Sequence, residues 1–270
     1  MIKNKVSVVI PSLGGDVLIR TIRALNSGTL IPHEILIVVP NNNNLGIPPL
    51  NYQNIRFILS QSRGQVPQRV EGFMRSACEY VLQLDDDVIL DGNCVKSLRE
   101  GIRERSAIGP IMYYYNSGAS VYTYRPNLLI NIKDYLVHGF KFGKRKMGTI
   151  SKSVVPFGYD PKVYDKTITV TEWLAGGCIL HNKTNLILSD YYSFKGKAYC
   201  EDLIHSTLLR QNKITLLVHK NAKCYIENIE ATNYSLFNDF KAKIKFNRLN
   251  NRGNNYLYLW FLLKKVWGRS

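Results

Sequence analysis

Three consecutive carboxylates, Asp85, Asp86 and Asp87, follow a mostly apolar run in the stretch EYVLQLDDDVILDG at residues 79–92. Adjacent carboxylates repel one another at neutral pH unless a cation lies among them or water surrounds them. A hard divalent cation such as Mg²⁺ or Mn²⁺ binds carboxylate oxygens and leaves coordination positions for water and phosphates. The triplet therefore indicates a cation site, and the alternative is an acidic turn before the helix that follows Asp91.

A second acidic pair, Glu201 and Asp202, lies in the stretch AYCEDLIHSTLLRQNK at residues 198–213. Carboxylates in the first turn of a helix stabilise the helix dipole and need no catalytic role. The functional alternative is that one of them is a general base, which takes a hydroxyl proton within hydrogen-bond reach. The residues alone leave both interpretations open. His205 lies one turn beyond Asp202, where it is either an orienting partner or an ordinary buried histidine.

Short apolar runs alternate with helical patterns over the first hundred residues, which predicts βαβ units and a parallel sheet covered on both faces. In such sheets ligands bind outside the carboxyl ends of the strands. The aspartate triplet directly follows the fourth predicted strand, so we expect it to form part of a site. The expected elements are strands at residues 6–10, 34–39, 55–59 and 80–84, and helices at residues 16–26 and 66–77.

The pattern beyond Leu90 is more mixed. We expect residues 121–166 to be irregular, with short elements, and residues 167–180 to form a strand that Gly176 and Gly177 interrupt. The chain is expected to divide into a domain at residues 1–232 and a C-terminal helical, basic and aromatic extension at residues 233–270. The remaining expected elements are helices at residues 94–103, 201–211 and 236–248, and strands at residues 108–115 and 214–218.

The charge balance is strongly basic. The 270 residues include 36 Lys and Arg against 20 Asp and Glu, a formal net charge of +16. Such an excess favours a polyanionic partner, such as nucleic acid, an acidic membrane surface or a phosphorylated substrate. The basic residues are dispersed and show no nucleic-acid-binding motif, so no nucleic acid is expected. A polyanion- or nucleic-acid-binding protein is therefore an alternative that rests on charge alone.

The cysteines and the apolar segments bear on location. Five scattered cysteines without a CxxC pair predict neither a zinc site nor a disulfide framework, and so favour a reducing compartment. The apolar run near the N-terminus is too short for a signal peptide, and no segment approaches the ~20 apolar residues of a membrane span. These features predict a cytoplasmic protein.

The last helical segment is a candidate for membrane contact. Residues 256–263 form an unbroken apolar run before Lys264 and Lys265. Trp260, Trp267 and the lysines suit a helix that lies on an anionic lipid surface. The alternative is a helix that packs on the rest of the protein. A peripheral position on the inner face of the membrane is thus a further expectation.

Taken together, these segments resemble the inverting, family-two type of glycosyltransferase with a GT-A fold, over residues of about 5–230. The resemblance lies in the order of VSVVIPSLGG, EILIVV, GQVPQRVEGFMRSACEYVLQLDDDV, EWLAGGCIL and the helix that holds Glu201, Asp202 and Arg210. It implies a Rossmann-like, mostly parallel central sheet flanked by helices. It also implies metal-dependent transfer of a sugar, with inversion, from a nucleotide-diphosphate sugar, a UDP-sugar, to a saccharide or lipid-linked acceptor in polysaccharide or glycolipid assembly.

The same resemblance implies roles for individual residues. Asp87 is expected to bind the Mg²⁺ or Mn²⁺ ion, and Asp202 to be the catalytic base. The expected donor-binding residues are Pro11, Ser12, Asn41, Arg69, Asp85 and Asp86, and the expected acceptor-side residues are Trp173, Gly176, Gly177 and Glu201.

The chain departs from the family pattern in three places. Asn41 and the three asparagines after it replace an acidic turn that helps to recognise the nucleotide base of the donor. Ile204 replaces a second acidic residue in the helix of Asp202. Only His219 or Glu227 is available as a third metal ligand. A nucleotidyltransferase-like enzyme is the alternative of related shape. That class usually has a Gly- and Lys- or Arg-rich loop after the first strand, whereas this chain has only Gly14 and Gly15 there.

Overall fold

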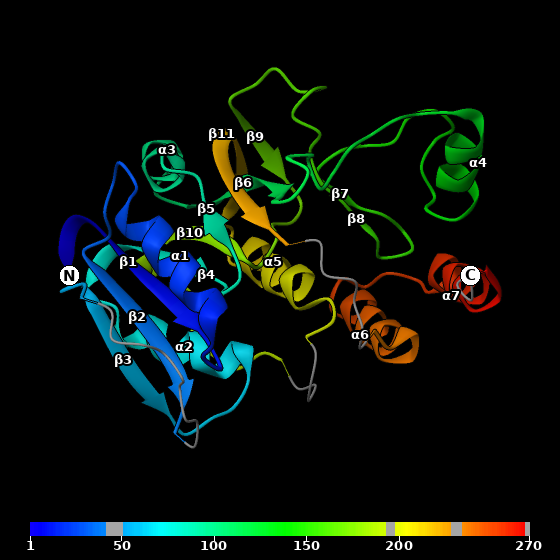
Figure 1. Cartoon of the computed structure of the whole chain (residues 1–270). Coiled ribbons are helices and arrows are strands. Elements are labelled where there is room, and N and C mark those ends of the chain that lie inside the picture. Colours follow the sequence, from blue (N-terminus) through cyan, green and yellow to red (C-terminus); the bar gives the residue numbers. More distant parts are fainter. Residues whose placement is uncertain (42–50, 193–197, 228–233, 268–270) are drawn as a thin grey trace.

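A large, mostly parallel sheet flanked by helices forms the centre of the protein (Figure 1). The computed structural model describes residues 1–41, 51–192, 198–227 and 234–267. Within these residues the sheet has nine strands: eight follow the order β3-β2-β1-β4-β10-β6-β11-β5, and the ninth, β9, pairs with β11. The strands are β1 (Ile2–Pro11), β2 (Glu34–Pro40), β3 (Ile55–Ser60), β4 (Cys78–Leu84), β5 (Ile89–Leu90), β6 (Ser106–Tyr114), β9 (Ile168–Thr171), β10 (Cys178–Asn182) and β11 (Thr215–Ile226).

The two faces of the sheet bury alternate residues of β1. Val8 and Ile10 pack with Leu18 and Ile22 of α1, whereas Val9 packs on the other face. All seven residues of β2 are buried, as expected for a parallel strand covered on both sides. The expected α/β class is confirmed. The helices that cover the sheet are α1 (Asp16–Asn26) and α3 (Cys94–Gly101) on one face, and α2 (Gln65–Arg75) and α5 (Glu201–Gln211) on the other.

The order of the strands places a crevice at the end of β1. The chain steps from β1 to β2 and β3 in one direction across the sheet, and the next strand, β4, pairs with the opposite edge of β1. At such a switch point the loops after the two central strands diverge, so a ligand can enter between them. Ser12 follows β1 and Asp85 follows β4, so both lie at this crevice.

The middle of the chain differs from the prediction. Residues 167–180 do not form one strand, because β9 and β10 occupy different places in the sheet and residues 172–177 cross between them. The predicted strand at residues 214–218 extends to Ile226 through a register shift between His219 and Lys223. The expected irregular region contains a helix, α4 (Leu128–Leu136), and the paired strands β7 (Thr149–Ile150) and β8 (Pro156–Phe157).

The chain ends in two helices, α6 (Leu236–Leu249) and α7 (Asn255–Trp267). Leu257 and Trp260 of α7 are buried against Phe240 of α6, so Trp260 is a packing residue and not an interfacial anchor. Phe246 of α6 belongs to a hydrophobic cluster that also contains residues of α2 and α5. This packing joins the C-terminal helices to the main domain. The expected boundary between residues 232 and 233 lies outside the described residues.

No helix in the described part of the chain has both the length and the apolar character needed to cross a membrane. The five cysteines are free thiols.

Candidate active site

An open pocket of about 920 Å³ lies at the carboxyl ends of β1 and β4 and at the start of α2. This volume is in the range of small-molecule binding sites. Its polar wall includes Ser12, Gln65, Asp85, Asp86, Asp87 and Asp190. Pro11 also lines the pocket. The sheet topology therefore brings the first predicted site residues and the aspartate triplet into one cavity, although 73 positions separate Ser12 from Asp85 in the sequence.

Two of the three aspartates are held by hydrogen bonds. The Ser12 hydroxyl donates to Asp86 Oδ2 at 2.5 Å, and Gln65 Nε2 donates to Asp85 Oδ1 at 2.8 Å. The Thr21 hydroxyl of α1 donates to the backbone carbonyl of Asp86 at 2.8 Å, which fixes the turn after β4. Two carboxylates are thus oriented by neutral donors from other elements.

Asp87 differs from its two neighbours. It is the most exposed of the three residues, although its carboxyl is still partly shielded from water, and no other residue in the described part of the chain donates a hydrogen bond to that carboxylate. Burial raises the pKa of all three carboxyls, and the charges of Asp85 and Asp86 raise that of Asp87 further. Ionising all three is therefore unfavourable without a nearby positive charge.

This donor set fits a hard divalent cation, because carboxylate oxygens are its preferred ligands and Asp87 has oxygens free to bind. Among the described residues, no three His, Cys, Asp or Glu side chains are arranged to enclose an ion. Mg²⁺ characteristically binds through one or two carboxylates and completes its shell with water and substrate phosphates.

The two candidates for a third metal ligand have different surroundings. His219 is buried and its Nδ1 accepts backbone N–H groups of Asn221 and Ala222, so it is a structural residue of the β11 bend. Glu227 is near enough to raise the pKa of Asp87, but its carboxylate pairs with Arg20 at 2.5 Å. The contacts of His219 thus give no support to its possible role as a third metal ligand.

Arg69 connects the two acidic segments. Its guanidinium contacts Glu201 at 2.8 Å and Asp85 at 3.4 Å, and its side chain is 1% exposed. Burial alone would lower the pKa of Arg69, but Glu201, Tyr191 and Asp85 raise it above its usual value. Arg69 thus lies beneath the pocket, where it neutralises one carboxylate from each segment.

Glu201, expected on the acceptor side, does not face open space. Its side chain is 5% exposed, and it accepts hydrogen bonds from Arg69 and from the Tyr191 hydroxyl. Tyr191 in turn stacks on His205, with ring centroids 5.5 Å apart. His205 is therefore a buried packing partner of Tyr191, and Glu201 is the buried partner of Arg69.

Asp202 is partly buried beside Glu201 at the start of α5. Burial, followed by the charge of Glu201, raises the pKa of its carboxyl to about 7. Its Oδ1 accepts the Leu203 backbone N–H at 2.9 Å. Near neutral pH, a carboxyl with such a pKa is partly ionised, and the ionised form readily accepts a proton. A general base needs this property.

Gly176 and Gly177 lie between the two acidic clusters. A Cβ atom on Gly177 would be 3.3 Å from Asp85 Oδ2, and one on Gly176 would be 3.1 Å from Glu201 Oε2 and 3.5 Å from Asp202 Cβ. Larger residues would therefore press on these side chains. The glycine pair allows the triplet segment and the start of α5 to approach the same stretch of backbone.

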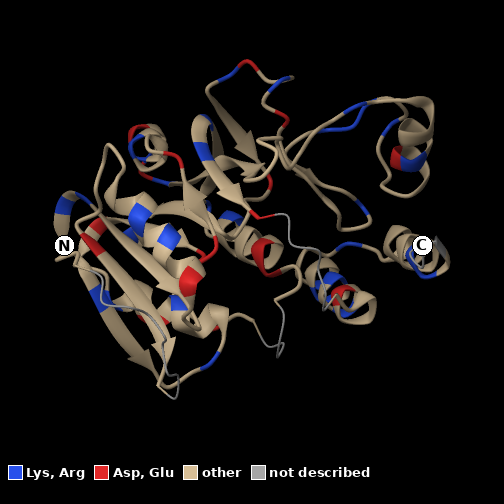
Figure 2. Cartoon of the chain, in the orientation of Figure 1, with Lys and Arg blue, Asp and Glu red and all other residues tan. Residues whose placement is uncertain are grey.

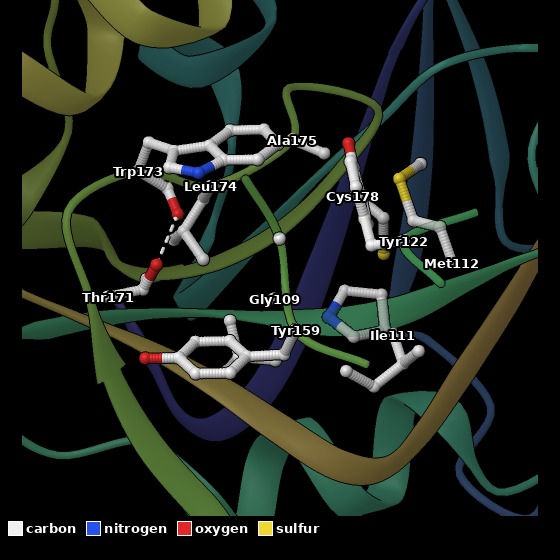
Figure 3. Close-up of a pocket in the computed structure, with 13 residues that line it drawn as sticks. Gly109, Ile111, Met112, Tyr122, Tyr159, Thr171, Trp173, Leu174, Ala175 and Cys178 are labelled. Atoms are coloured by element: carbon white, nitrogen blue, oxygen red, sulfur yellow. Dashed lines mark hydrogen bonds between the residues drawn. The ribbon is translucent and has the colours of Figure 1, made fainter. Parts of the chain in front are cut away.

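Trp173, also expected on the acceptor side, is buried and lines a second, small cavity of about 30 Å³ (Figure 3). Its ring contacts Tyr122 edge-on at 5.6 Å, and its carbonyl accepts the Thr171 hydroxyl at 3.0 Å. The cavity is mostly apolar and has room for about one water molecule. In this structure Trp173 is a core residue next to the site.

Asn41, expected to contact the donor base, is exposed at the end of β2 and is not part of the pocket wall. The three asparagines after it lie outside the described residues.

Several pocket residues escaped the sequence analysis. Gln65 and Gln68 belong to the helix that follows Gly64, and Gln68 donates to the carbonyls of Ser12 and Val38. Their position after a predicted strand was a usable signal, since such loops meet at the ligand edge of the sheet. Asp190 and Tyr192, which also line the pocket, had no such signal, because they lie in an irregular segment.

Comparisons with known proteins agree with this architecture. The sequence model of the family described as glycosyl transferase family 2 matches residues 7–159. No curated protein sequence matches the chain.

Solved structures share the fold at low sequence identity. A structure of GalNAc-T7 with UDP, GalNAc and Mn²⁺ aligns with a TM-score of 0.61 and 15% identity, over 90% of this chain and 48% of that one. S. aureus TarS 1-349 aligns with a TM-score of 0.54 and 13% identity, over 91% of this chain and 65% of that one. Its complex with UDP-GlcNAc aligns equally well and is covered to 66%. This chain thus spans less than two thirds of each neighbour.

Proposed function

Because this chain belongs to glycosyl transferase family 2 and has the GT-A fold, we propose that it transfers a sugar from a nucleotide-diphosphate sugar to an acceptor hydroxyl. The observation that carries the proposal is the convergence of Ser12, the aspartate triplet and the start of α2 on one pocket at the switch point of the sheet. Asp202 is not part of the pocket wall, but it lies next to Gly176, and the adjacent Gly177 lies next to Asp85.

The proposed donor is a UDP-sugar, held with Mg²⁺ or Mn²⁺. The structural neighbours were solved with UDP and Mn²⁺ or with UDP-GlcNAc, which supports this donor class. Asp87 would hold the ion, with Asp85 and Asp86 oriented toward the donor by Gln65 and Ser12. When bound, the ion supplies positive charge that stabilises the departing diphosphate.

In the proposed reaction, Asp202 removes the proton of the acceptor hydroxyl. The hydroxyl oxygen forms a bond to the anomeric carbon from the face opposite the diphosphate, and the bond from that carbon to the diphosphate oxygen breaks. One displacement of this kind inverts the anomeric centre. Arg69 and Glu201 act as positioning residues, since both are buried and bonded to each other.

The proposed acceptor is a saccharide or a lipid-linked sugar, in polysaccharide or glycolipid assembly. The excess of basic residues would also favour attachment to an anionic membrane on its cytoplasmic side.

Binding of UDP should stabilise the protein only when a divalent ion is present, and Asp87→Ala should abolish the effect. A nucleotide at about a hundred times its dissociation constant stabilises the folded state by ~2.7 kcal/mol. Without Asp87 the ion loses its free carboxylate, so the shift in melting temperature with UDP and Mn²⁺ should vanish. A thermal-shift panel of nucleotide diphosphates with and without Mn²⁺ measures this.

The matched control for this panel is Asp165→Ala, since Asp165 is exposed and lies outside the pocket. It should respond to UDP and Mn²⁺ as the wild type does. If UDP alone stabilises both the wild type and Asp87→Ala to the same extent, the metal assignment is wrong.

The rate of transfer should rise with pH up to about 7 and then level off. The carboxyl of Asp202 has a pKa of about 7, and a general base must be deprotonated to accept a proton. Below that pKa the ionised fraction, and with it kcat/KM, should fall about tenfold per pH unit. Initial rates between pH 5.5 and 8.5, roughly the range in which such a carboxyl titrates, measure the profile.

Binding of UDP and Mn²⁺ must be measured at each pH, because the triplet carboxyls titrate as well. A transfer rate that stays constant from pH 5.5 upward, with donor binding also constant, would contradict the assignment of Asp202.

A further inference from the structure

Helix α4 presents a row of apolar side chains to solvent. Leu128, Ile132 and Leu136 are spaced four residues apart, and Leu129 and Tyr135 lie beside them on the same face of the helix. All five side chains are exposed, and Leu129 is 76% exposed. Contiguous exposed apolar surface of this kind marks an interaction site in a soluble protein.

The helix is held firmly at one end of the molecule. Asp134, on its opposite side, is buried and accepts two hydrogen bonds from Arg145, at 2.7 and 2.9 Å. Val137, directly after the helix, packs with Leu257 and Trp260 of α7. Helix α7 lies at the same end (Figure 1) and carries a similar exposed row. That row consists of Tyr258, Leu259, Leu262 and Val266.

On α4, on α7 and between residues 137 and 152, the exposed charges are all basic. Between residues 125 and 152 the only acidic residue is Asp134, and it is buried by Arg145. Helix α7 contains no acidic residue, and its ribbon in Figure 2 carries the colour of basic residues but not that of acidic ones. The exposed charges near the apolar rows belong to Lys133, Lys141, Lys144, Lys146, Lys264 and Lys265.

We propose that the α4 face, together with the exposed row of α7, docks on the surface of an anionic lipid bilayer. Apolar rows that project from helices and are bordered by lysines match the interfacial region, where apolar groups enter the acyl boundary and lysines meet lipid phosphates. A second copy of this chain would bring lysines against lysines, which disfavours self-association. The side chains project instead of lining a groove, which disfavours an acidic peptide.

This docking surface rests on the proposed function and deepens it. It would hold the enzyme where a lipid-linked acceptor lies. It adds α4, which was not expected as a helix, to the C-terminal segment as a candidate for membrane contact, and α4 contributes the larger apolar row.

Flotation of the full chain with vesicles tests the proposal. The wild type should float with vesicles of phosphatidylcholine and phosphatidylglycerol and remain in the soluble fraction with phosphatidylcholine alone. The double variant Leu128→Asp, Leu129→Asp should bind at least about tenfold more weakly, because two apolar anchors are lost. Replacing Lys141, Lys144 and Lys146 by Gln should weaken binding about a hundredfold at low salt.

The control is Leu59→Asp, which changes an exposed leucine on the edge strand β3, and it should float as the wild type does. The melting temperature of each variant checks that it folds. Equal flotation of the wild type and the Leu128→Asp, Leu129→Asp variant overturns the proposal. The proposal is also overturned if the wild type sediments as a dimer, this variant sediments as a monomer, and the two proteins float equally.

The same proteins separate this proposal from the sugar-transfer proposal. The Leu128→Asp, Leu129→Asp variant should keep the thermal shift with UDP and Mn²⁺, because α4 is remote from the pocket residues. A wild type that binds UDP with Mn²⁺ but never floats overturns the docking surface alone. A wild type that floats but does not bind UDP overturns the donor assignment alone.

Discussion

Asp202→Asn should lower the rate of sugar transfer about a thousandfold and leave donor binding unchanged. Asparagine has the shape of aspartate but cannot take a proton from the acceptor hydroxyl. The aspartate triplet that would hold the ion and the diphosphate is a separate segment, so the thermal shift with UDP and Mn²⁺ should persist. Initial rates and thermal shifts on the same preparation measure both quantities.

The stability of this variant provides an independent check. The pKa of Asp202 in the folded protein is about 7, above its value in the unfolded chain, so the folded state loses stability as the pH rises from about 4 to 7. Asparagine has no such titration. The Asp202→Asn variant should therefore be at least as stable as the wild type at pH 8, and a loss of activity cannot be assigned to unfolding.

The rival base is Asp190, which lines the pocket directly and whose Oδ1 accepts the Tyr192 backbone N–H at 3.2 Å. The Asp190 residue is exposed, whereas Asp202 is partly buried. Asp190→Asn should retain most of the transfer rate. If instead Asp190→Asn is inactive and Asp202→Asn transfers sugar normally, the two roles must be exchanged.

Arg69→Met should destabilise the protein by about 3–5 kcal/mol. The substitution leaves Glu201 and Asp85 buried or half-buried without their shared positive charge. For a chain of this size the melting temperature should fall by about 10 °C at pH 8. Thermal or denaturant unfolding measures the loss.

Acidification should partly rescue the Arg69→Met variant. Arg69 lowers the pKa of Asp85, so without the guanidinium that pKa rises further in the folded state. The resulting loss of stability is absent at low pH and grows as the pH increases. The control is Arg75→Met, because Arg75 forms an exposed pair with Glu71 and is worth at most about 1 kcal/mol. Equal losses in the two variants would show that Arg69 has no special structural role.

The first hundred residues were predictable because β1, β2 and β4 each contain a short, buried apolar run, and amphipathic helices alternate with several of the strands. Helices α1 and α5 begin and end where the sequence predicts, and the aspartate triplet follows β4 as expected. The second half was harder. The residues from β9 to β10 were predicted to form one interrupted strand. Instead, β9 pairs with β11 and β10 pairs with β4, so the two strands lie at different places in the sheet.

The site was predictable to the same degree. Pro11, Ser12 and the triplet meet in one pocket because strand ends of a parallel sheet share an edge. Side chains whose role depends on packing were less accessible to prediction. Glu201 and Trp173 were expected on the acceptor side, yet both are buried. Arg69 and Tyr191 donate hydrogen bonds to the Glu201 carboxylate, and the Tyr122 ring packs against that of Trp173.

The sequence by itself determined the class of fold and the chemistry available at the edge of the sheet, since periodicity and residue type are local properties of the chain. Only the tertiary structure decided which carboxylates are open and which are neutralised. Asp87 and Glu201 are both acidic residues next to regular elements, but one faces the pocket and the other is bonded to Arg69. That difference arises from contacts between residues more than a hundred positions apart, which no local pattern contains.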